Sequence, residues 1–239
     1  MKSLEIQTLE IGKCISESLN GEVYEAIFEG RSVIYRKPPT GTLELDIYQK
    51  FSGNPAIPNF LGTYKSGLVL EKLGDNLETA VSSKHLRFNP EDFNKVSEFL
   101  DIIHADGYIH RDIQPGNIVI NNAALGIIDF GLVRKFSKSW ISDSSHTVIR
   151  YASSNQLKSL HESPSDDLYS YALVCSYAFT GIRPWSDLGG AAIIMEVSRK
   201  HFPDDYGRKF RTWLSHIFSE RKLKASEVPQ IVYDLVQVQ

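Results

Sequence analysis

The chain has 239 residues, of which 42% are apolar, enough to bury either one large core or two lobes. Its formal net charge at pH 7 is only -3, which excludes a general electrostatic attraction to nucleic acid or to an acidic membrane. The two cysteines form no disulfide framework, and the longest apolar stretch, residues 171–180, is too short to span a bilayer, so we expect an intracellular protein, cytoplasmic or nuclear.

The first seventy residues are predicted to form antiparallel strands and one helix. The pair Glu29-Gly30 separates two apolar runs and is typical of a tight hairpin turn. The apolar side chains of residues 43–51 fall on one face of a helix, which Gly53-Asn54-Pro55 ends. The strands are expected at residues 23–28, 32–36, 60–64 and 67–70.

From residue 89 the chain is predicted to be mainly helical. Asn89-Pro90 begins one helix, whose apolar stripe stops at Gly107. A second helix, from about residue 166 to residue 180, is expected to be capped by Ser165. Because this helix is apolar on nearly every side, we expect it to lie at the centre of its lobe.

The order of these elements predicts an α+β fold in two lobes. A small antiparallel sheet lobe with one helix, residues 1–73, precedes a larger helical lobe, residues 74–239. Residues 71–74 link the two lobes. A nucleotide is expected in the crevice beneath the sheet.

Two short motifs carry the chemistry. Residues 110–117 read H-R-D-I-Q-P-G-N, and residues 129–131 read D-F-G after a predicted hairpin. Because a hairpin brings its two ends together, we expect Asn117 and Asp129 to lie side by side. Their oxygens suit Mg²⁺, which takes its other ligands from water and phosphate. Asp112 is close enough to accept the proton of an incoming hydroxyl.

These motifs resemble the catalytic loop and the metal-binding loop of eukaryotic-type protein kinases. Over most of its length the chain resembles the casein kinase 1 family, with the vaccinia-related kinases as near neighbours. The segment Arg150-Tyr151-Ala152-Ser153, in place of the usual Ala-Pro-Glu, indicates this branch. The resemblance implies a bilobal kinase fold, ATP and Mg²⁺ as cofactors, and serine or threonine of a protein substrate as the acceptor.

The resemblance also implies roles for individual residues. Asp112 would be the catalytic base, Asn117 and Asp129 the metal ligands, and Asp167 the brace of the catalytic loop. Glu44 would pair with a strand lysine. The catalytic positions are Asp112, Gln114, Asn117, Lys37 and Glu44. The nucleotide-binding positions are Ser16, Ser18, Gly21, Val23, Ile34, Arg36, Lys37, Leu70, Glu71, Leu73 and Asp129. Among these, the side chain of Leu70 would border the space behind adenine, and backbone groups of Glu71 and Leu73 would contact the adenine edge.

The expected glycine-rich loop departs from the family pattern. Residues 16–23 keep only Gly21, with Ser16 and Ser18 at the earlier glycine positions. A Cβ atom at these positions keeps the backbone amides further from the phosphates. We therefore expect a stiffer or more distant lid and weaker nucleotide binding.

The lysine that anchors the phosphates has two candidates. Placing Arg36 there keeps the apolar alternation of the strand, whereas placing Lys37 there puts Tyr35 over the adenine. Because side chains alternate along a strand, only one of the two can point at Glu44 without a bulge. Arginine keeps the charge but not the compact ammonium. We favour Lys37 slightly, because Arg36 would be an unusual anchor.

Gln114 stands where serine/threonine kinases usually carry a lysine that touches the transferring phosphoryl group. An amide donates a hydrogen bond but does not offset developing charge. Because such charge stabilisation is worth roughly a hundredfold in rate, we predict a slow kinase.

The segment after the metal loop allows a regulatory hypothesis. Kinases are often phosphorylated here, and Arg111, Arg134, Lys135 and Lys138 are available to receive the added charge. A solvated loop without a regulatory role is the simpler interpretation. The candidate acceptors are Ser137, Ser139, Ser142, Ser144, Ser145 and Thr147.

Three functions compete. The first is an active protein serine/threonine kinase. The second is a pseudokinase that keeps the fold as a binding module, motivated by Ser16, Ser18 and Gln114. The third is a small-molecule kinase of the aminoglycoside or choline type, against which Arg111 argues because those enzymes usually have glycine after the catalytic-loop histidine. We expect a monomer that binds ATP and a protein substrate, without direct contact to nucleic acid.

Overall fold

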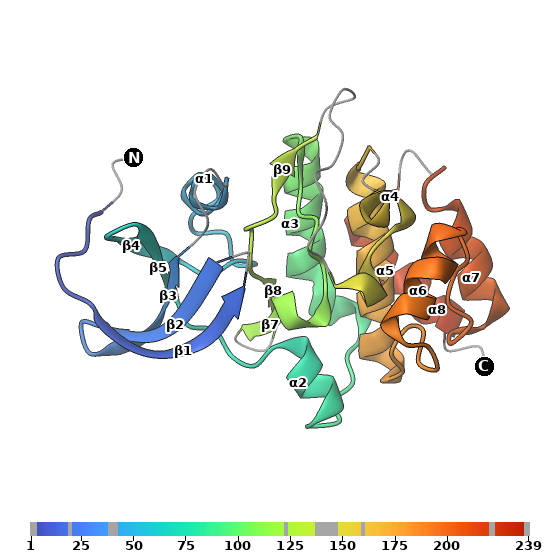
Figure 1. Cartoon of the computed structure of the whole chain (residues 1–239), viewed down its shortest axis with the longest axis horizontal. Helices are drawn as coiled ribbons and strands as arrows, with labels where there is room; N and C mark the ends of the chain where they lie inside the picture. Colours follow the sequence, from blue (N-terminus) through green and yellow to red (C-terminus); the bar gives the residue numbers. More distant parts are fainter. Residues whose placement is uncertain are drawn as a thin grey trace.

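The computed structural model describes residues 4–18, 21–37, 43–121, 124–136, 148–158, 161–219 and 223–236. A sheet and one helix occupy one end of the molecule, and the remaining helices occupy the other (Figure 1). This arrangement confirms the predicted α+β bilobal fold. Within the described ranges, no helix is long and apolar enough to cross a membrane.

The sheet at the N-terminal end has five antiparallel strands in the order β1-β2-β3-β5-β4. The turn between β2 and β3 consists of Glu29 and Gly30, both with positive φ, as a tight two-residue hairpin requires. The predicted hairpin is thereby confirmed. The strands are β1 Glu10–Ser18, β2 Gly21–Phe28, β3 Arg31–Lys37, β4 Phe60–Tyr64 and β5 Gly67–Glu71.

The predicted helix of this lobe is α1, Glu44–Lys50, and it buries Glu44, Ile47 and Tyr48. These three residues share one face of the helix because they are three and four positions apart. Glu44 is the only charged residue on that face and needs a partner inside the protein.

An N-terminal segment pairs with the edge of the sheet, which the sequence did not predict. The amide of Ile6 donates to the carbonyl of Thr63 at 2.7 Å, and the amide of Thr63 donates to the carbonyl of Leu4 at 2.9 Å. Ile6 and Leu9 pack with Tyr35 and other side chains on the sheet face opposite to α1.

The helical lobe is built around α5, Pro164–Thr180, in which every residue from Asp166 to Phe179 is buried. The prediction of a central helix is confirmed, but its predicted cap is wrong. Ser163, not Ser165, is the N-cap, because Pro164 fits the first helical position and the Asp166 carboxylate accepts from the Ser163 amide at 2.8 Å.

The other elements of this lobe surround α5 or form two short two-stranded sheets (Figure 1). The helices are α2 Leu77–Ser82, α3 Asn94–Ala105, α4 Ser154–Leu157, α6 Gly190–Ser198, α7 Gly207–His216 and α8 Val228–Val236. The single-turn helices are η1 Pro90–Phe93, η2 Pro115–Asn117, η3 Ile149–Tyr151 and η4 Ala225–Glu227. The short strands are β6 Tyr108–Ile109, β7 Ile118–Asn121, β8 Ala124–Ile127 and β9 Arg134–Lys135.

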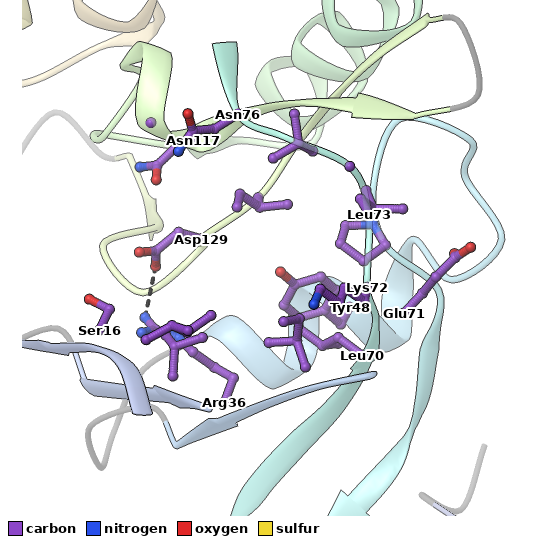
Figure 2. Close-up of a pocket in the computed structure, with 18 of the residues that line it drawn as sticks. Ser16, Arg36, Tyr48, Leu70, Glu71, Lys72, Leu73, Asn76, Asn117 and Asp129 are labelled. Atoms are coloured by element: carbon purple, nitrogen blue, oxygen red, sulfur yellow. Dashed lines mark hydrogen bonds and ion pairs between the residues drawn. The ribbon is translucent and has the colours of Figure 1, made fainter. Parts of the chain in front are cut away.

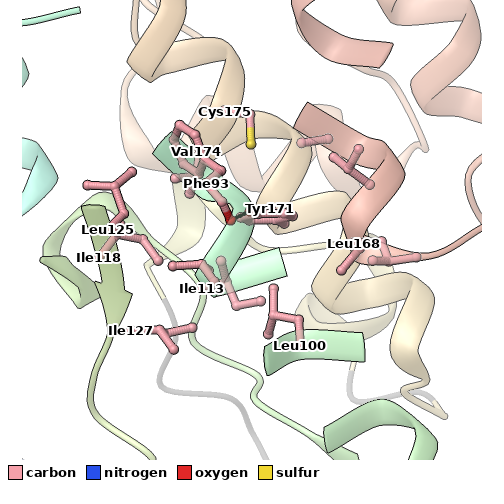
Figure 3. Packing of buried hydrophobic residues seen from close by; sticks show 14 of the residues in the cluster. Phe93, Leu100, Ile113, Ile118, Leu125, Ile127, Leu168, Tyr171, Val174 and Cys175 are labelled. Atoms are coloured by element: carbon pink, nitrogen blue, oxygen red, sulfur yellow. Dashed lines mark hydrogen bonds between the residues drawn. The ribbon is translucent and has the colours of Figure 1, made fainter. Parts of the chain in front are cut away.

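One hydrophobic core connects the two lobes. Figure 3 shows side chains of the β7–β8 hairpin, such as Ile118 and Leu125, near Phe93 and Tyr171 of the helical lobe. The same cluster includes Ile47 and Leu70 from the sheet lobe. The hairpin that carries the two predicted metal ligands is therefore packed against buried helices, which fixes its position.

Candidate active site

A cavity of about 430 Å³ lies between the sheet and the β7–β8 hairpin (Figure 2). Most of the expected nucleotide-binding residues line it: Ser16, Val23, Ile34, Arg36, Leu70, Glu71, Leu73 and Asp129. Two of the expected catalytic residues, Glu44 and Asn117, also line it. Gly21, Lys37, Asp112 and Gln114 are not among the lining residues. The side chain of Ser18 and the serine-rich segment 137–147 lie outside the described residues.

The inner part of the cavity is apolar on two opposite sides. Val23, Ile34 and Leu70 come from the sheet, and Val119 and Ile128 come from the hairpin and the residue that follows it. An apolar slot of this kind, with residues 71–74 of the linking segment also lining the cavity, suits a heterocycle.

The hairpin brings Asn117 and Asp129 to the same wall of the cavity, as predicted. Ile118 pairs with Ile127, and the amide of Ile128 donates to the carbonyl of Asn117 at 2.9 Å. Figure 2 shows both polar side chains on the cavity wall. Asp129 has a φ of 64°, a left-handed conformation that re-aims its side chain where the strand ends.

Asn117 and Asp129 present oxygens that fit a divalent cation. The Nδ2 group of Asn117 donates to Asp112, and Oδ1 of Asp129 accepts from the Gly131 amide at 3.2 Å. Asn117 Oδ1 and Asp129 Oδ2 have no such bond among the described residues. One amide and one carboxylate oxygen suit Mg²⁺, which keeps few protein ligands in nucleotide sites. In the described part of the chain, no three His, Cys, Asp or Glu side chains form an alternative metal cluster.

Asp112 is buried, 4% exposed, and the side-chain amides of Asn117 and Gln114 donate to its carboxylate. Its Oδ2 accepts from Asn117 Nδ2 at 2.8 Å and from Gln114 Nε2 at 3.0 Å. Because both donors are neutral, they orient the carboxylate without adding a positive charge.

The slight preference for Lys37 as the partner of Glu44 is wrong. Arg36 points into the cavity, and its Nε donates to the two carboxylate oxygens of Glu44 at 3.1 and 3.3 Å. Lys37 is on the opposite face of β3, where its Nζ donates to Glu22 at 2.9 Å and its side chain is 40% exposed. The strand has no bulge here, so neighbouring side chains point to opposite faces of the sheet. Tyr35 is fully buried in the apolar cluster on the face away from the cavity, and Arg36 therefore points into the cavity.

Arg36 also contacts Asp129. Its Nη2 donates to Asp129 Oδ1 at 2.7 Å, the contact drawn in Figure 2. Burial disfavours the charged guanidinium, but the carboxylates of Asp129 and Glu44 outweigh that effect and raise the pKa of Arg36 above its ordinary value. Burial raises the pKa of Glu44 to about 7, with Arg36 opposing the rise and Asp129 adding to it.

The start of the catalytic loop is held by Asp167 of the central helix α5. The amides of His110 and Arg111 donate to the carboxylate of Asp167 at 2.7 and 2.9 Å, and His104 Nε2 lies 2.8 Å from it. Burial disfavours the charged form of Asp167, but these partners outweigh it, so the pKa of Asp167 is lowered. The expectation that Asp167 braces the loop is confirmed.

Phe130 connects the metal loop to both lobes. Its ring lies 5.2 Å from that of Tyr48 on α1 and 5.1 Å from that of His110, centroid to centroid. Burial, and then the charges of Glu44 and Asp129, raise the pKa of Tyr48, whose phenol also bonds to the backbone of Asp129. The position of α1 is therefore coupled to the position of Asp129.

Arg111, a candidate receiver of a loop phosphate, is engaged by an internal carboxylate. Its Nε and Nη2 donate to the two oxygens of Glu162, each at 3.1 Å, and both side chains are almost fully buried. A bidentate pair of this kind already supplies the negative charge that a phosphate would bring. The hypothesis that Arg111 receives such a phosphate is therefore weakened.

Several cavity residues were missed from the sequence. Tyr48 follows Glu44 by one helical turn, so the helical periodicity alone indicated that it faces the same way. The alternation of side chains along the hairpin strands indicated that Val119 and Ile128 face the cavity. Lys72 and Asn76 lie on and after the linking segment, where no short motif indicates them.

The fold and the site together define a phosphotransferase: an apolar nucleotide slot beneath a sheet, an amide and a carboxylate for a cation, and a second carboxylate nearby. A family model described as protein kinase domain matches residues 40–234. The chain belongs to the protein kinase family, in its eukaryotic-type form. The match begins after β3, so Ser16, Ser18 and Arg36, three departures from the family pattern, lie outside it.

Proposed function

We propose that the protein is an ATP- and Mg²⁺-dependent serine/threonine protein kinase of the casein kinase 1 and vaccinia-related branch. The observation that carries this proposal is the convergence of Asp112, Asn117 and Asp129 at the end of one hairpin, beside an apolar slot. The substrate class rests on the resemblance at residues 150–153.

In this proposal each residue has one physical task. ATP with its Mg²⁺ supplies the transferable phosphoryl group and positive charge to balance it. Asn117 and Asp129 would hold the cation, and with it the phosphates that it binds. Asp112 accepts the proton of the acceptor hydroxyl, and the amides of Asn117 and Gln114 orient its carboxylate for this transfer.

Arg36 takes the position of the phosphate-anchoring lysine. Its guanidinium is held by Glu44, which ties the anchor to α1. A guanidinium binds phosphate oxygens with two parallel N–H groups, so Arg36 suits this task chemically, although its charge is spread over a larger group than an ammonium.

We also propose the lobe boundaries 1–73 and 74–239, a monomeric protein and a cytoplasmic or nuclear location. The hydrophobic cluster common to both lobes supports treating them as one kinase domain.

A catalytically impaired binding module is the second candidate, and Arg36 is the observation that favours it. Arg36 bonds to both Glu44 and Asp129, so the anchor and one metal ligand neutralise each other inside the cavity. A protein that uses this contact only to hold its fold would bind partners without transferring phosphate.

Transfer of radiolabelled phosphate from ATP to a mixed protein substrate panel separates the two candidates. We expect Mg²⁺-dependent labelling of serine or threonine by the wild type, and a loss of about a hundredfold or more in Asp112→Asn, which keeps the shape but not the base. Labelling by the wild type that is no greater than by Asp112→Asn would contradict the kinase proposal.

A further inference from the structure

The metal ligand Asp129 is also bonded to a cationic group of the protein itself. Arg36 Nη2 lies 2.7 Å from Asp129 Oδ1 (Figure 2). We propose that Arg36 keeps divalent cations off Asp129 until the phosphates of a nucleotide draw the guanidinium away. The inference rests on the proposed function, because it concerns the same nucleotide and metal site.

The contact between Arg36 and Asp129 has the geometry of a strong hydrogen bond between charged groups. The side chain of Arg36 is 5% exposed and that of Asp129 is 28% exposed, so water screens the pair poorly. The same oxygen of Asp129 accepts from the Gly131 amide, which leaves Oδ1 fully engaged. A cation that approaches Asp129 meets one occupied oxygen and a buried positive charge.

Glu44 keeps the guanidinium in this place. Arg36 Nε donates to both carboxylate oxygens of Glu44, which is fully buried on α1. The two ends of the guanidinium therefore bind two different carboxylates at once. A lysine would have to bond to both carboxylates from one nitrogen, whereas the guanidinium reaches them from two separate nitrogens held in one rigid plane.

The phosphates of a nucleotide would compete with Asp129 for Arg36. Phosphate oxygens accept from a guanidinium with the same two-bond geometry as a carboxylate and carry more negative charge. Once Arg36 Nη2 turns to phosphate, Asp129 is left with an unneutralised charge that favours a cation. Nucleotide and cation must then strengthen each other's binding, because such coupling is reciprocal.

A purely structural role for Arg36 predicts a different outcome. In that case the contact only joins α1 to the metal loop, and its removal loosens the loop and weakens cation binding. Under our proposal its removal strengthens cation binding in the absence of nucleotide. The sign of the change therefore separates the two roles.

The test is a titration of the full chain with Mn²⁺, followed by electron paramagnetic resonance, without nucleotide. Because Arg36→Met alone leaves Glu44 buried without its cation, the double variant Arg36→Met with Glu44→Gln is measured beside it. We expect both to bind Mn²⁺ about tenfold more tightly than the wild type. The matched control is Arg31→Met, which removes the same charge from an exposed position on the same strand and should leave the affinity unchanged.

Binding of an ATP analogue with Mn²⁺ is measured in parallel. If the wild type binds the analogue but the double variant shows unchanged or weaker Mn²⁺ affinity, the role of Arg36 as a gate is overturned and the proposed kinase function stands. If the wild type binds no analogue at all, the proposed function fails and the gate fails with it.

Discussion

Arg36 shows what one side chain changes at the residue scale. The resemblance to kinases implies a lysine facing Glu44, and an arginine faces it instead. Because the guanidinium has donors at both ends, it bonds to Asp129 at the same time. In the cavity, the guanidinium of Arg36 is therefore already bonded to the carboxylates of Glu44 and Asp129. A nucleotide that binds Arg36 through its phosphates must break at least one of these contacts.

Gln114 is the residue where a single change is expected to raise activity. Its amide already donates to Asp112, and a lysine there would keep this contact and add a positive charge beside the transferring group. We predict that Gln114→Lys increases kcat by about tenfold or more, measured by steady-state phosphate transfer.

The control for this prediction is Gln114→Met, which removes the hydrogen bond without adding charge and should not increase kcat. If Gln114→Lys leaves turnover unchanged or lower, the missing charge is not what limits the rate.

Glu44 gives the stability a pH dependence of known sign. Its pKa is raised from 4.5 to about 7 by burial, so the folded protein keeps a proton that the unfolded chain loses. The contribution of Glu44 to the free energy of unfolding is fully present below pH 4.5 and is lost as the pH rises through 7. We predict that the wild type loses stability relative to Glu44→Gln as the pH rises over this range, measured by urea unfolding. A stability difference independent of pH would contradict this.

Two details of single residues, the orientation of Arg36 and the N-cap of α5, could not be predicted from the sequence. Arg36 and Lys37 are neighbours with the same charge, and the choice between them depends on which face of the strand the buried Tyr35 needs. That preference comes from packing against the N-terminal segment, which no local pattern reports. The cap of α5 was misplaced by two residues because both Ser163 and Ser165 are good cap residues, and only the fit of Pro164 separates them.

At the scale of elements, local signals were sufficient for most of the fold. The β2–β3 turn, α1, the β7–β8 hairpin and the central helix are encoded by turn residues and apolar periodicity within short windows. The expected pairing of β7 with β8 was therefore enough to predict that Asn117 and Asp129 lie side by side. Pairing of residues 4–6 with β4 was not predictable, because it joins segments far apart in sequence.

Gly62 on β4 makes that pairing possible. Its φ is 152°, and a Cβ atom there would lie 2.5 Å from the carbonyl oxygen of Leu4. We predict that Gly62→Ala destabilises the protein by about 1–3 kcal/mol and exposes the amides of residues 4–9 to hydrogen exchange.

The matched control is Gly53→Ala, which also has positive φ but has open space around its Cβ position. It should cost only about 1 kcal/mol of backbone strain and leave exchange at residues 4–9 unchanged. Equal exchange in both variants would contradict the role assigned to Gly62.

At the scale of the whole molecule, one hydrophobic cluster joins the two lobes. It includes Ile47 and Leu70 on the sheet side and Phe99, Leu168 and Tyr171 on the helical side. Because neither lobe has this core to itself, we predict a single cooperative unfolding transition. Pulsed hydrogen exchange at the amides of the five-stranded sheet and the fluorescence of the tryptophans, all of which lie after residue 73, should give the same urea midpoint. Two separate midpoints would show that the lobes unfold independently.

The central claim is that Asn117 and Asp129 hold a divalent cation against the phosphates of a nucleotide. Calorimetric titration with ATP, with and without Mg²⁺, tests it most directly in the wild type and in Asp129→Asn, which keeps the shape of the side chain and removes its charge. The account predicts that Mg²⁺ tightens ATP binding by about tenfold or more in the wild type and far less in the variant. An equal effect of Mg²⁺ in both proteins, or no ATP binding by the wild type, would contradict it.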